Sequence, residues 1–329
     1  MKILPYVEEI DKKPIMAKRL KRTPSIVNKL KRLRGKLQLT TMNDIAGCRV
    51  ILSNKKKVYK LNKLLLKKTV FELRKDYIQT PRESGYRSLH LIGKFFNENQ
   101  NTHYVELQIR TFVQHYWATA VEIVDLFTNQ SIKSNMGNKQ WESWFQHLSE
   151  LFALFEENPY LHSSNVKLNA SQYKDTYIKN KTEDLTFSLF QVYSLNKKLN
   201  IIEKFQLFTK SINIANEQLK NITQKGFVLI IIDQLEDNKY SINSEFFLET
   251  EFEKANEQYL EAEKNTLNNN HYVTAFVATN AIGGIREAYP NYFADSTKFL
   301  EYLGILVSLY EHINPKLFRM LHEIKYLNK

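Results

Sequence analysis

Residues 103–111 read HYVELQIRT, and their strict alternation of apolar and polar side chains most limits how this chain can fold. Successive side chains of a β-strand point to opposite faces of its sheet. One face would carry three apolar side chains: Val105, Leu107 and Ile109. The other face would carry a carboxylate, an amide and a guanidinium: Glu106, Gln108 and Arg110. A half-buried strand with a solvated face gives the same pattern, so the polar row alone does not establish a site.

Strand-like runs alternate with amphipathic helical stretches from residue 1 to about residue 157. This pattern predicts an α+β fold, a mixed β-sheet flanked by helices. Residues 158–183 are polar and weakly periodic, which predicts a linker. Residues 184–329 predict a second unit that is α+β or mostly helical. Its expected helices lie near 184–222, 250–265, 280–288 and 294–327, and its expected strands near 227–233 and 271–278.

Positive charge is concentrated at the N-terminal end. Residues 1–75 hold 22 Lys or Arg and 5 Asp or Glu, a balance of +17, and the remaining residues hold 25 and 30, a balance of −5. Such a region predicts a polyanionic partner, either nucleotide phosphates or a nucleic acid backbone. A solvated Lys-rich surface is the alternative.

The composition predicts a soluble, cytoplasmic protein without a membrane partner. No apolar run approaches the roughly 18 residues that a membrane helix needs. The longest run, FVLIIID at 227–233, has the length of a strand, and the N-terminus lacks the apolar stretch of a secretory signal. The single cysteine, Cys48, cannot form an internal disulfide, which fits a reducing compartment.

Asp44 lies at the entrance of an apolar strand in NDIAGCRVIL, residues 43–52. A turn or helix cap would explain an aspartate there. If Glu106 lies on a neighbouring strand, the two carboxylates could instead hold a divalent cation. Two carboxylates plus substrate phosphates are a usual way for proteins to bind Mg²⁺.

A basic segment, AKRLKRTPSIVNKLKRLRGK at 17–36, could converge on a polyphosphate. The chain contains neither GxxxxGK[ST] nor GxGxxG, so side chains rather than a glycine-rich loop would have to hold the phosphates. An exposed basic helix without a specific ligand would have the same composition.

The stretch PRESGYRSLH at 81–90 places Tyr86 directly after a turn, where its ring could stack on a nucleobase. Three nearby cations could offer charge to the phosphates of the nucleotide that carries this base: Lys75, Arg82 and Arg87. His90 adds a donor whose charge changes near neutral pH.

Four segments in this order resemble the synthetase domain of the RelA/SpoT alarmone synthetase family. They are RLKRTPSIVNKLKR, DIAGCRVIL, KDYIQTPRESGYRSLHL and VELQIRTFVQHYWATAVE. The resemblance covers about residues 15–157, and it implies a synthetase domain at 1–157 with a nucleotidyltransferase-like sheet. Residues 184–329 show no pattern of the ribosome-sensing domains that the long family members append. Their role is unknown; regulation of the synthetase is the hypothesis, with dimerisation or stabilisation as the alternative.

The resemblance implies transfer of the β,γ-pyrophosphate of ATP to a ribose 3′-hydroxyl. By position, the residues that would bind ATP are Arg19, Lys21, Lys29 and Arg49. The catalytic positions are Glu106, Asp44, His90 and Arg110. Asp44 and Glu106 would hold Mg²⁺, Glu106 would also activate the hydroxyl, and Tyr86 would stack on the acceptor base. Hydrolase activity is not expected, because only about 15 residues precede the ATP motif.

Two acceptors fit the family: GDP or GTP, giving (p)ppGpp, and the 3′ CCA end of tRNA, as in toxic relatives. The basic N-terminal region favours tRNA modestly. The alternative function is a catalytically silent RNA-binding or interaction module on the same scaffold. AMP transfer is disfavoured, because no D-x-D follows a Gly-Ser turn. Further partners would be a regulatory or antitoxin protein, and the oligomeric state is left open.

Overall fold

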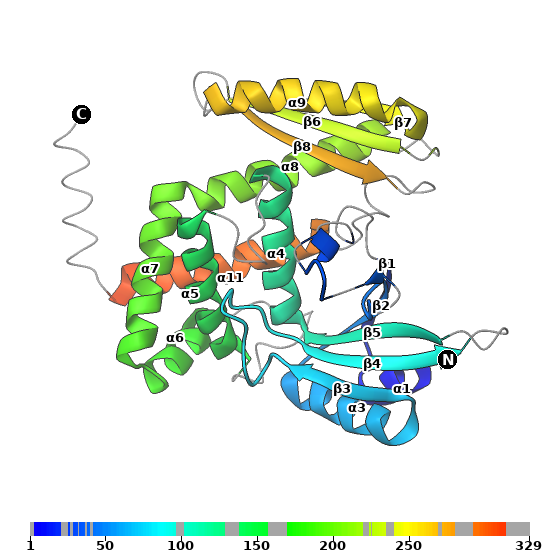
Figure 1. The fold of residues 1–329 in the computed structure, drawn as a ribbon. Helices are drawn as coiled ribbons and strands as arrows, with labels where there is room; N and C mark the ends of the chain where they lie inside the picture. The colour runs from blue at the N-terminus through cyan, green and yellow to red at the C-terminus, as the bar shows by residue number, and fades with distance from the viewer. Residues whose placement is uncertain are drawn as a thin grey trace. The chain divides into compact units, whose positions relative to one another are not determined.

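The computed structural model describes residues 3–20, 26, 29–31, 33–36, 38–39, 42–96, 102–128, 138–156, 170–219, 224, 226–234, 240–268, 272–279 and 292–313. The chain forms two compact units (Figure 1). Residues 1–115 and 149–180 make up the first unit, and residues 116–148 and 181–329 make up the second. The domain boundaries predicted at residues 157 and 183 differ from these limits, and they stay a prediction.

The first unit contains a five-stranded sheet in the order β1-β2-β5-β4-β3. Its strands are β1 (Ile15–Leu20), β2 (Ala46–Leu52), β3 (Phe71–Asp76), β4 (Leu89–Phe96) and β5 (Thr102–Thr111). β2 and β5 run parallel, and every other neighbouring pair is antiparallel. The mixed sheet predicted from the sequence is therefore confirmed.

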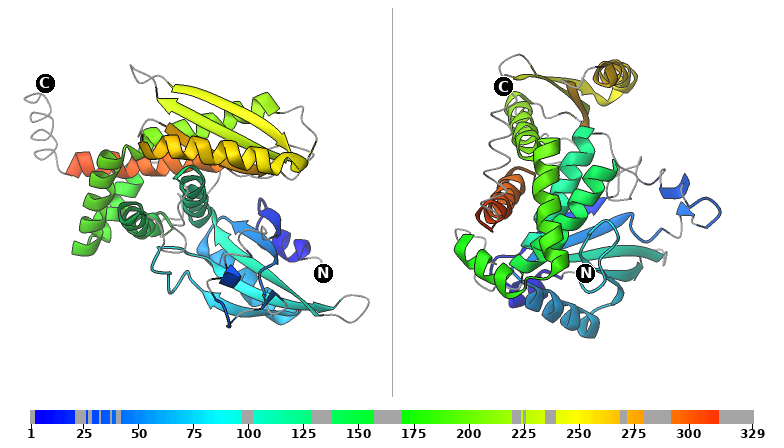
Figure 2. Two further views of the ribbon diagram at one scale, coloured as in Figure 1. Left: turned by 45° about the horizontal axis from the view of Figure 1, so that its top comes forward. Right: turned by 90° about the vertical axis from the view of Figure 1, so that its left-hand side faces the viewer.

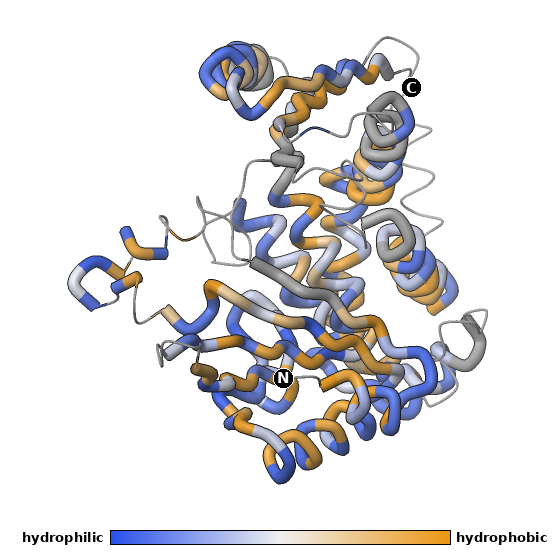
Figure 3. The backbone as a smooth tube through the Cα atoms, turned by 90° about the vertical axis from the view of Figure 1, so that its right-hand side faces the viewer, coloured by the Kyte–Doolittle hydropathy of each residue, from blue (hydrophilic) through white to orange (hydrophobic). Residues whose placement is uncertain are grey.

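One face of this sheet is apolar and is covered by α1 (Leu4–Ile10) and α3 (Lys55–Lys68) (Figure 1). Asn54 caps α3 by accepting a hydrogen bond from the Lys57 amide at 2.9 Å, as a helix start requires. Leu107 and Ile109 of β5 are fully buried in the core between the sheet and these helices. Hydrophobic and hydrophilic residues are mixed along the strands of the sheet (Figure 3), and in β5 they alternate.

The register of the strands places polar residues side by side on the opposite face. Gln108 of β5 pairs with His90 of β4 on one side and with Arg49 of β2 on the other. His90 in turn pairs with Lys75 of β3. Directly paired residues point to the same face of a sheet. One row of polar side chains therefore crosses four strands.

Three further helices contribute to the first unit: the first turn of α4 (Phe112–Thr128), the end of α5 (Lys139–Phe155), and α6 (Ala170–Lys179). Thr111 caps α4, because its hydroxyl accepts a hydrogen bond from the Gln114 amide at 3.2 Å. Glu156, at the end of α5, accepts hydrogen bonds from the Thr111 hydroxyl and from Gln114 Nε2, the latter at 3.1 Å. This buried cluster fastens the end of α5 to the strand that carries Glu106.

The helix α6 lies within the segment predicted to be a linker. Tyr173 of α6 is fully buried, donates a hydrogen bond to the Leu151 carbonyl at 3.1 Å, and stacks on Phe155 with 3.9 Å between ring centroids. This packing is hard to predict from the sequence, because the buried residues Tyr173 and Tyr177 lie among polar neighbours. Residues 158–169 lie outside the described part of the chain.

The second unit is also α+β, as predicted. Its elements after residue 181 are α7 (Glu183–Leu199), α8 (Ile201–Leu219), β6 (Gly226–Gln234), β7 (Tyr240–Leu248), the short η5 (Glu249–Glu251), α9 (Phe252–Asn268), β8 (Tyr272–Thr279) and α11 (Tyr292–Ile313). The strands form an antiparallel sheet in the order β7-β6-β8, along which α9 packs (Figure 2).

Two predictions for this unit need correction. The helix expected at 184–222 is two helices, because Asn200 adopts a left-handed conformation with φ of 51° and ends α7. The strand β7 was missed, because its sequence YSINSEFFL is polar at its start. The helix expected at 280–288 lies outside the described residues. None of the helices in the described ranges is long and apolar enough to span a bilayer.

Candidate active site

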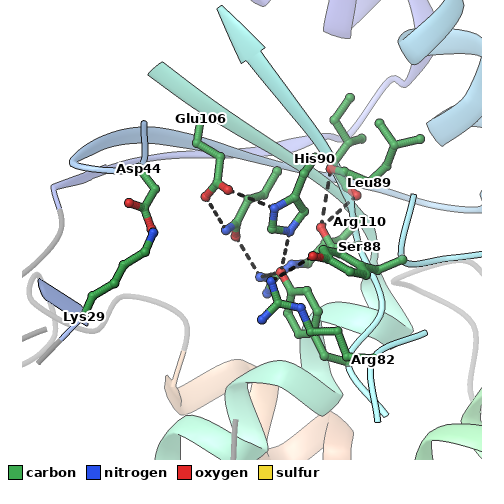
Figure 4. A network of polar contacts seen from close by, with 12 residues as sticks. Lys29, Asp44, Arg82, Ser88, Leu89, His90, Glu106 and Arg110 are labelled. Carbon is green, nitrogen blue, oxygen red and sulfur yellow. Dashed lines mark hydrogen bonds and ion pairs between the residues drawn. The ribbon is translucent and has the colours of Figure 1, made fainter. Parts of the chain in front are cut away.

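The polar face of the five-stranded sheet gathers three of the four predicted catalytic residues, Glu106, His90 and Arg110, into one hydrogen-bonded network (Figure 4). Glu106, Gln108 and Arg110 project from alternate positions of β5, and His90 projects from β4 beside them. The alternation that buries Leu107 thus also builds the site.

The Glu106 carboxylate is held at both oxygens. His90 Nδ1 lies 2.9 Å from Oε1, and Gln108 Nε2 donates to Oε2 at 2.8 Å. Burial raises the pKa of Glu106. The hydrogen bonds to His90 and Gln108 and the charge of His90 lower the pKa by more than burial raises it. The net pKa of Glu106 lies below its ordinary value, so the group is a carboxylate at neutral pH.

Asp44 lies in the turn before β2 and forms an ion pair with Lys29, whose Nζ is 2.8 Å from Oδ2. The charge of Asp44 acts to raise the pKa of Glu106, so the two carboxylates are within electrostatic range. They face the same space in Figure 4. The predicted pair is therefore brought together from a turn and a strand 62 residues apart in sequence.

This pair fits Mg²⁺ better than a metal held by protein alone. In the described ranges, no group of three or more His, Cys, Asp or Glu side chains could hold a metal ion. Two carboxylates with phosphate oxygens completing the shell suit Mg²⁺, which keeps few protein ligands.

A tight turn positions Tyr86. The Gly85 amide donates to the Arg82 carbonyl at 2.8 Å, and Gly85 has φ of 84°, a conformation that favours glycine. The Ser149 hydroxyl donates to the Gly85 carbonyl at 2.5 Å and ties the turn to α5. Tyr86 follows in a fixed position at the edge of the network.

Tyr86 differs from the open stacking platform that the sequence suggested. Its side chain is only 7% exposed, and its hydroxyl lies 2.9 Å from His90 Nε2 and 2.6 Å from Arg110 Nη2. The Arg82 guanidinium lies 4.4 Å from the ring centroid of Tyr77 and 5.4 Å from that of Tyr86. A base that stacks on Tyr86 would first have to displace the exposed Arg82 side chain.

The other predicted cations separate into two groups. Lys75 and Arg49 lie on the polar row, opposite His90 and Gln108 respectively. Arg87 instead donates to the Ser149 hydroxyl at 3.1 Å and to the Ile78 carbonyl at 3.4 Å. This geometry gives the predicted acceptor role of Arg87 no support.

Two predicted ATP contacts are only partly visible. Arg19 is in β1, where its backbone pairs with Gly47, and its side chain lies outside the described part of the chain. Lys21 also lies outside the described residues. Their roles stay predictions.

No role was predicted for Gln108 or Tyr77, both of which contact residues of the network. Gln108 links Glu106 to Arg110 along β5, because it donates to Glu106 and accepts from Arg110 at 2.7 Å. Its position midway between Glu106 and Arg110 on the polar face was the available signal. The Tyr77 ring contacts those of Tyr86 and His90 edge to face, which no sequence pattern indicated.

Comparison with known proteins supports the resemblance seen in the sequence. Residues 18–124 match the family described as a region found in RelA / SpoT proteins. GTP pyrophosphokinase YwaC of Bacillus subtilis is 42% identical over 114 residues, which are 31% of this chain and 52% of YwaC. GTP pyrophosphokinase YjbM of the same organism is 34% identical over 122 residues, 35% of this chain and 58% of YjbM. The chain thus spans about half the length of these curated relatives.

Among solved structures, small alarmone synthetase 2 from Bacillus subtilis is 30% identical, with 44% of this chain and 76% of that chain covered and a TM-score of 0.37. The matched region, 18–124, contains every predicted site residue. Residues 18–124 thus carry a region found in RelA / SpoT proteins, and the resemblance seen in the sequence is confirmed.

Proposed function

We propose that this chain is an ATP-dependent pyrophosphokinase that transfers the β,γ-pyrophosphate of ATP to the 3′-hydroxyl of a ribose. The observation that carries the proposal is the pair Asp44 and Glu106, within electrostatic range of each other on the polar face of one sheet. Glu106 is kept ionised by His90 and Gln108 and is ready to accept a proton.

Asp44 and Glu106 would hold Mg²⁺, which when bound supplies positive charge to the phosphates of ATP. Lys29 now neutralises Asp44. When a cation takes its place at Asp44, the Lys29 ammonium becomes available to the phosphates. Arg49 offers a second positive charge on the same face, and Arg19 and Lys21 are the further candidates.

Glu106 serves as the general base in this proposal. It takes the proton of the ribose 3′-hydroxyl while that oxygen bonds to the β-phosphorus of ATP. The bond between the β-phosphorus and the oxygen bridging to the α-phosphate breaks, and AMP leaves. The transfer depends on positioning and charge more than on a strong nucleophile, which suits a row of fixed polar groups.

GDP or GTP is the acceptor that the relatives favour, because YwaC and YjbM are both named GTP pyrophosphokinases. The 3′ end of tRNA is the second candidate, supported by the +17 balance of residues 1–75. A silent interaction module is disfavoured, because it would have no need for a hydrogen-bonded, ionised Glu106.

The test incubates the full chain with ATP labelled at the γ-phosphate and Mg²⁺, in separate reactions with GDP, GTP and bulk tRNA. The proposal expects AMP as the by-product and label in one class of acceptor. Label in guanine nucleotides supports alarmone synthesis, and label in tRNA alone supports the second candidate. Release of pyrophosphate with transfer of AMP, or no transfer to any acceptor, would overturn the proposal.

A further inference from the structure

Arg110 has a charge for which the proposed reaction gives no partner. Its side chain is 1% exposed. No carboxylate of the described residues lies within ion-pair distance of it, and its hydrogen bonds run from Nη2 to the Tyr86 hydroxyl at 2.6 Å and to Gln108 Oε1 at 2.7 Å. Arg110 Nε and Nη1 are also buried, and no described residue accepts a hydrogen bond from either nitrogen.

A buried charge without a counter-ion is strongly unfavourable. A guanidinium cannot escape this cost by losing its proton, because arginine side chains stay charged in proteins. The compensation must come from a neighbour. Of the two groups bonded to Arg110, the Gln108 amide is neutral, and the Tyr86 hydroxyl can ionise.

The other charged groups around Tyr86 also favour its ionised form. From β4, the His90 ring lies 2.9 Å from the Tyr86 oxygen, and from the turn Arg82 lies 5.4 Å from the ring centroid. From β5, the Arg110 guanidinium carbon lies 5.0 Å from that centroid. Glu106 lies beyond His90, bonded to its other nitrogen, and Tyr77 meets the ring edge to face.

These neighbours shift the pKa of the Tyr86 hydroxyl and the pKa of the His90 ring. Burial raises the pKa of the Tyr86 hydroxyl, but Arg110 and then His90 more than offset it and bring the pKa to about 7. Burial lowers the pKa of His90, whereas Tyr86 and Glu106 raise it to a net value above the ordinary one. The 2.6 Å separation from Arg110 is the length expected of a charge-assisted bond.

We propose that Tyr86 works through its hydroxyl, which as a phenolate is the counter-ion of Arg110 and fixes the His90 ring that holds Glu106. Tyr86 is then a positioning residue for the general base, in addition to any stacking by its ring. The inference rests on the proposed function for its catalytic consequence, whereas the ion pair itself exists in the ligand-free chain.

The ion pair is tested by ultraviolet difference titration of the full chain without ligands, which detects tyrosinate. Ordinary tyrosines ionise near pH 10, so a step equivalent to one residue near neutral pH is the expected signal. Tyr86→Phe should abolish that step, and Tyr77→Phe, which removes a neighbouring hydroxyl bonded to Arg82, should keep it. A wild-type chain without the step, or a step that survives in Tyr86→Phe, would overturn the pair.

A second variant covers the case in which Tyr86→Phe does not fold, as judged by circular dichroism. Arg110→Gln removes the cation and leaves Tyr86 in place. The near-neutral step should then move toward the ordinary range. A step that stays near neutral in folded Arg110→Gln contradicts the assignment of Arg110 as the counter-ion.

The catalytic consequence is tested by the separation of kcat from KM. Tyr86→Phe keeps the ring and loses only the oxygen, so we expect kcat to fall roughly tenfold to a hundredfold while the KM of the acceptor stays within about twofold. Tyr6→Phe, in α1 on the apolar face of the sheet, should leave kcat close to wild type. An unchanged kcat in Tyr86→Phe would show that the hydroxyl has no positioning role.

The two proposals fail in different ways. A near-neutral tyrosine step in a chain that transfers no pyrophosphate supports the ion pair and contradicts the proposed function. An active chain without the step supports the proposed function and contradicts the ion pair.

Discussion

The two sheets of this molecule differ in what their central strands carry. β5 of the first sheet alternates, with Leu107 and Ile109 buried on one face and Glu106, Gln108 and Arg110 bonded to one another on the other. β6 of the second sheet is apolar on both faces. Val228, Ile230 and Ile232 are buried on one side, and Leu229 packs toward α9 on the other.

The difference shows where chemistry is available. A strand covered on one face only can present ionisable groups to a substrate, whereas a strand covered on both faces contributes packing. The first sheet therefore carries the proposed reaction, and the second gives its unit a core. A role of the second unit in regulation or in oligomer formation remains a proposal.

The interleaving of the units affects how that proposal can be examined. Residues 116–148 belong to the second unit, although they precede the end of the predicted synthetase domain at 157. A chain cut at residue 160 would keep those residues and lose the rest of their unit. Substitutions in the full chain are the sounder comparison.

Apart from the proposed base Glu106, the largest effect is expected at Asp44. Asp44→Asn removes a charge from the proposed metal pair and should lower kcat/KM by roughly 100-fold or more, without a change in Tm beyond a few degrees. Steady-state assays at several Mg²⁺ concentrations measure it. Asp175→Asn, an exposed aspartate of α6, is the matched control and should behave as wild type. Near-normal activity of Asp44→Asn would contradict the proposed metal site on the first sheet.

Ile230→Ala tests the other side of the comparison. Ile230 is fully buried in the middle of β6, so its truncation should cost about 2–5 kcal/mol of unfolding free energy. Denaturant titration measures this loss, and kcat/KM per folded molecule should stay unchanged. A loss of activity in the folded variant would mean that the second sheet also serves the reaction.

The smallest effect is expected at Glu156. Burial raises the pKa of this carboxyl, and Thr111, Lys55, Gln114 and Arg87 lower it less, so the net pKa lies above its ordinary 4.5. The unfolded chain therefore loses this proton first as pH rises above about 4.5, and the group costs stability progressively above that pH.

Glu156→Gln removes this cost and keeps a group that can bond to Thr111 and Gln114. Its Tm should exceed that of wild type by roughly 2–4 °C at neutral pH and approach it at pH 4 or below, about where both states are protonated. Calorimetry at several pH values checks the sign. A lower Tm at neutral pH would show that the carboxylate stabilises the site.

The sequence predicted the part of the site that depends on strand periodicity. Once Glu106 alternates with buried Leu107, its face is determined, and a parallel neighbour carrying Asp44 at its entrance completes the pair. The environment of Tyr86 could not be predicted in this way. It depends on a bond from Arg110, 24 residues away, and on Arg82, which turns back over the rings.

The end of α7 and the strand β7 were missed for separate reasons. The helical pattern of residues 184–222 continues across Asn200, so only the backbone reveals that α7 ends there in a left-handed residue. The strand β7 begins with polar residues and is recognised only through its pairing with β6. In β7, pairing within the sheet overrides a weak local signal.

Glu106→Gln in the labelled-ATP assay tests the central claim most directly. Glu72→Gln, an exposed glutamate on β3 of the same sheet, is its matched control. Gln keeps the size of the side chain and removes the base, so pyrophosphate transfer should fall roughly 100-fold to 10,000-fold while the control stays near wild type. Transfer by folded Glu106→Gln at a rate close to wild type would contradict the account, because the network on β5 would then hold no catalytic base.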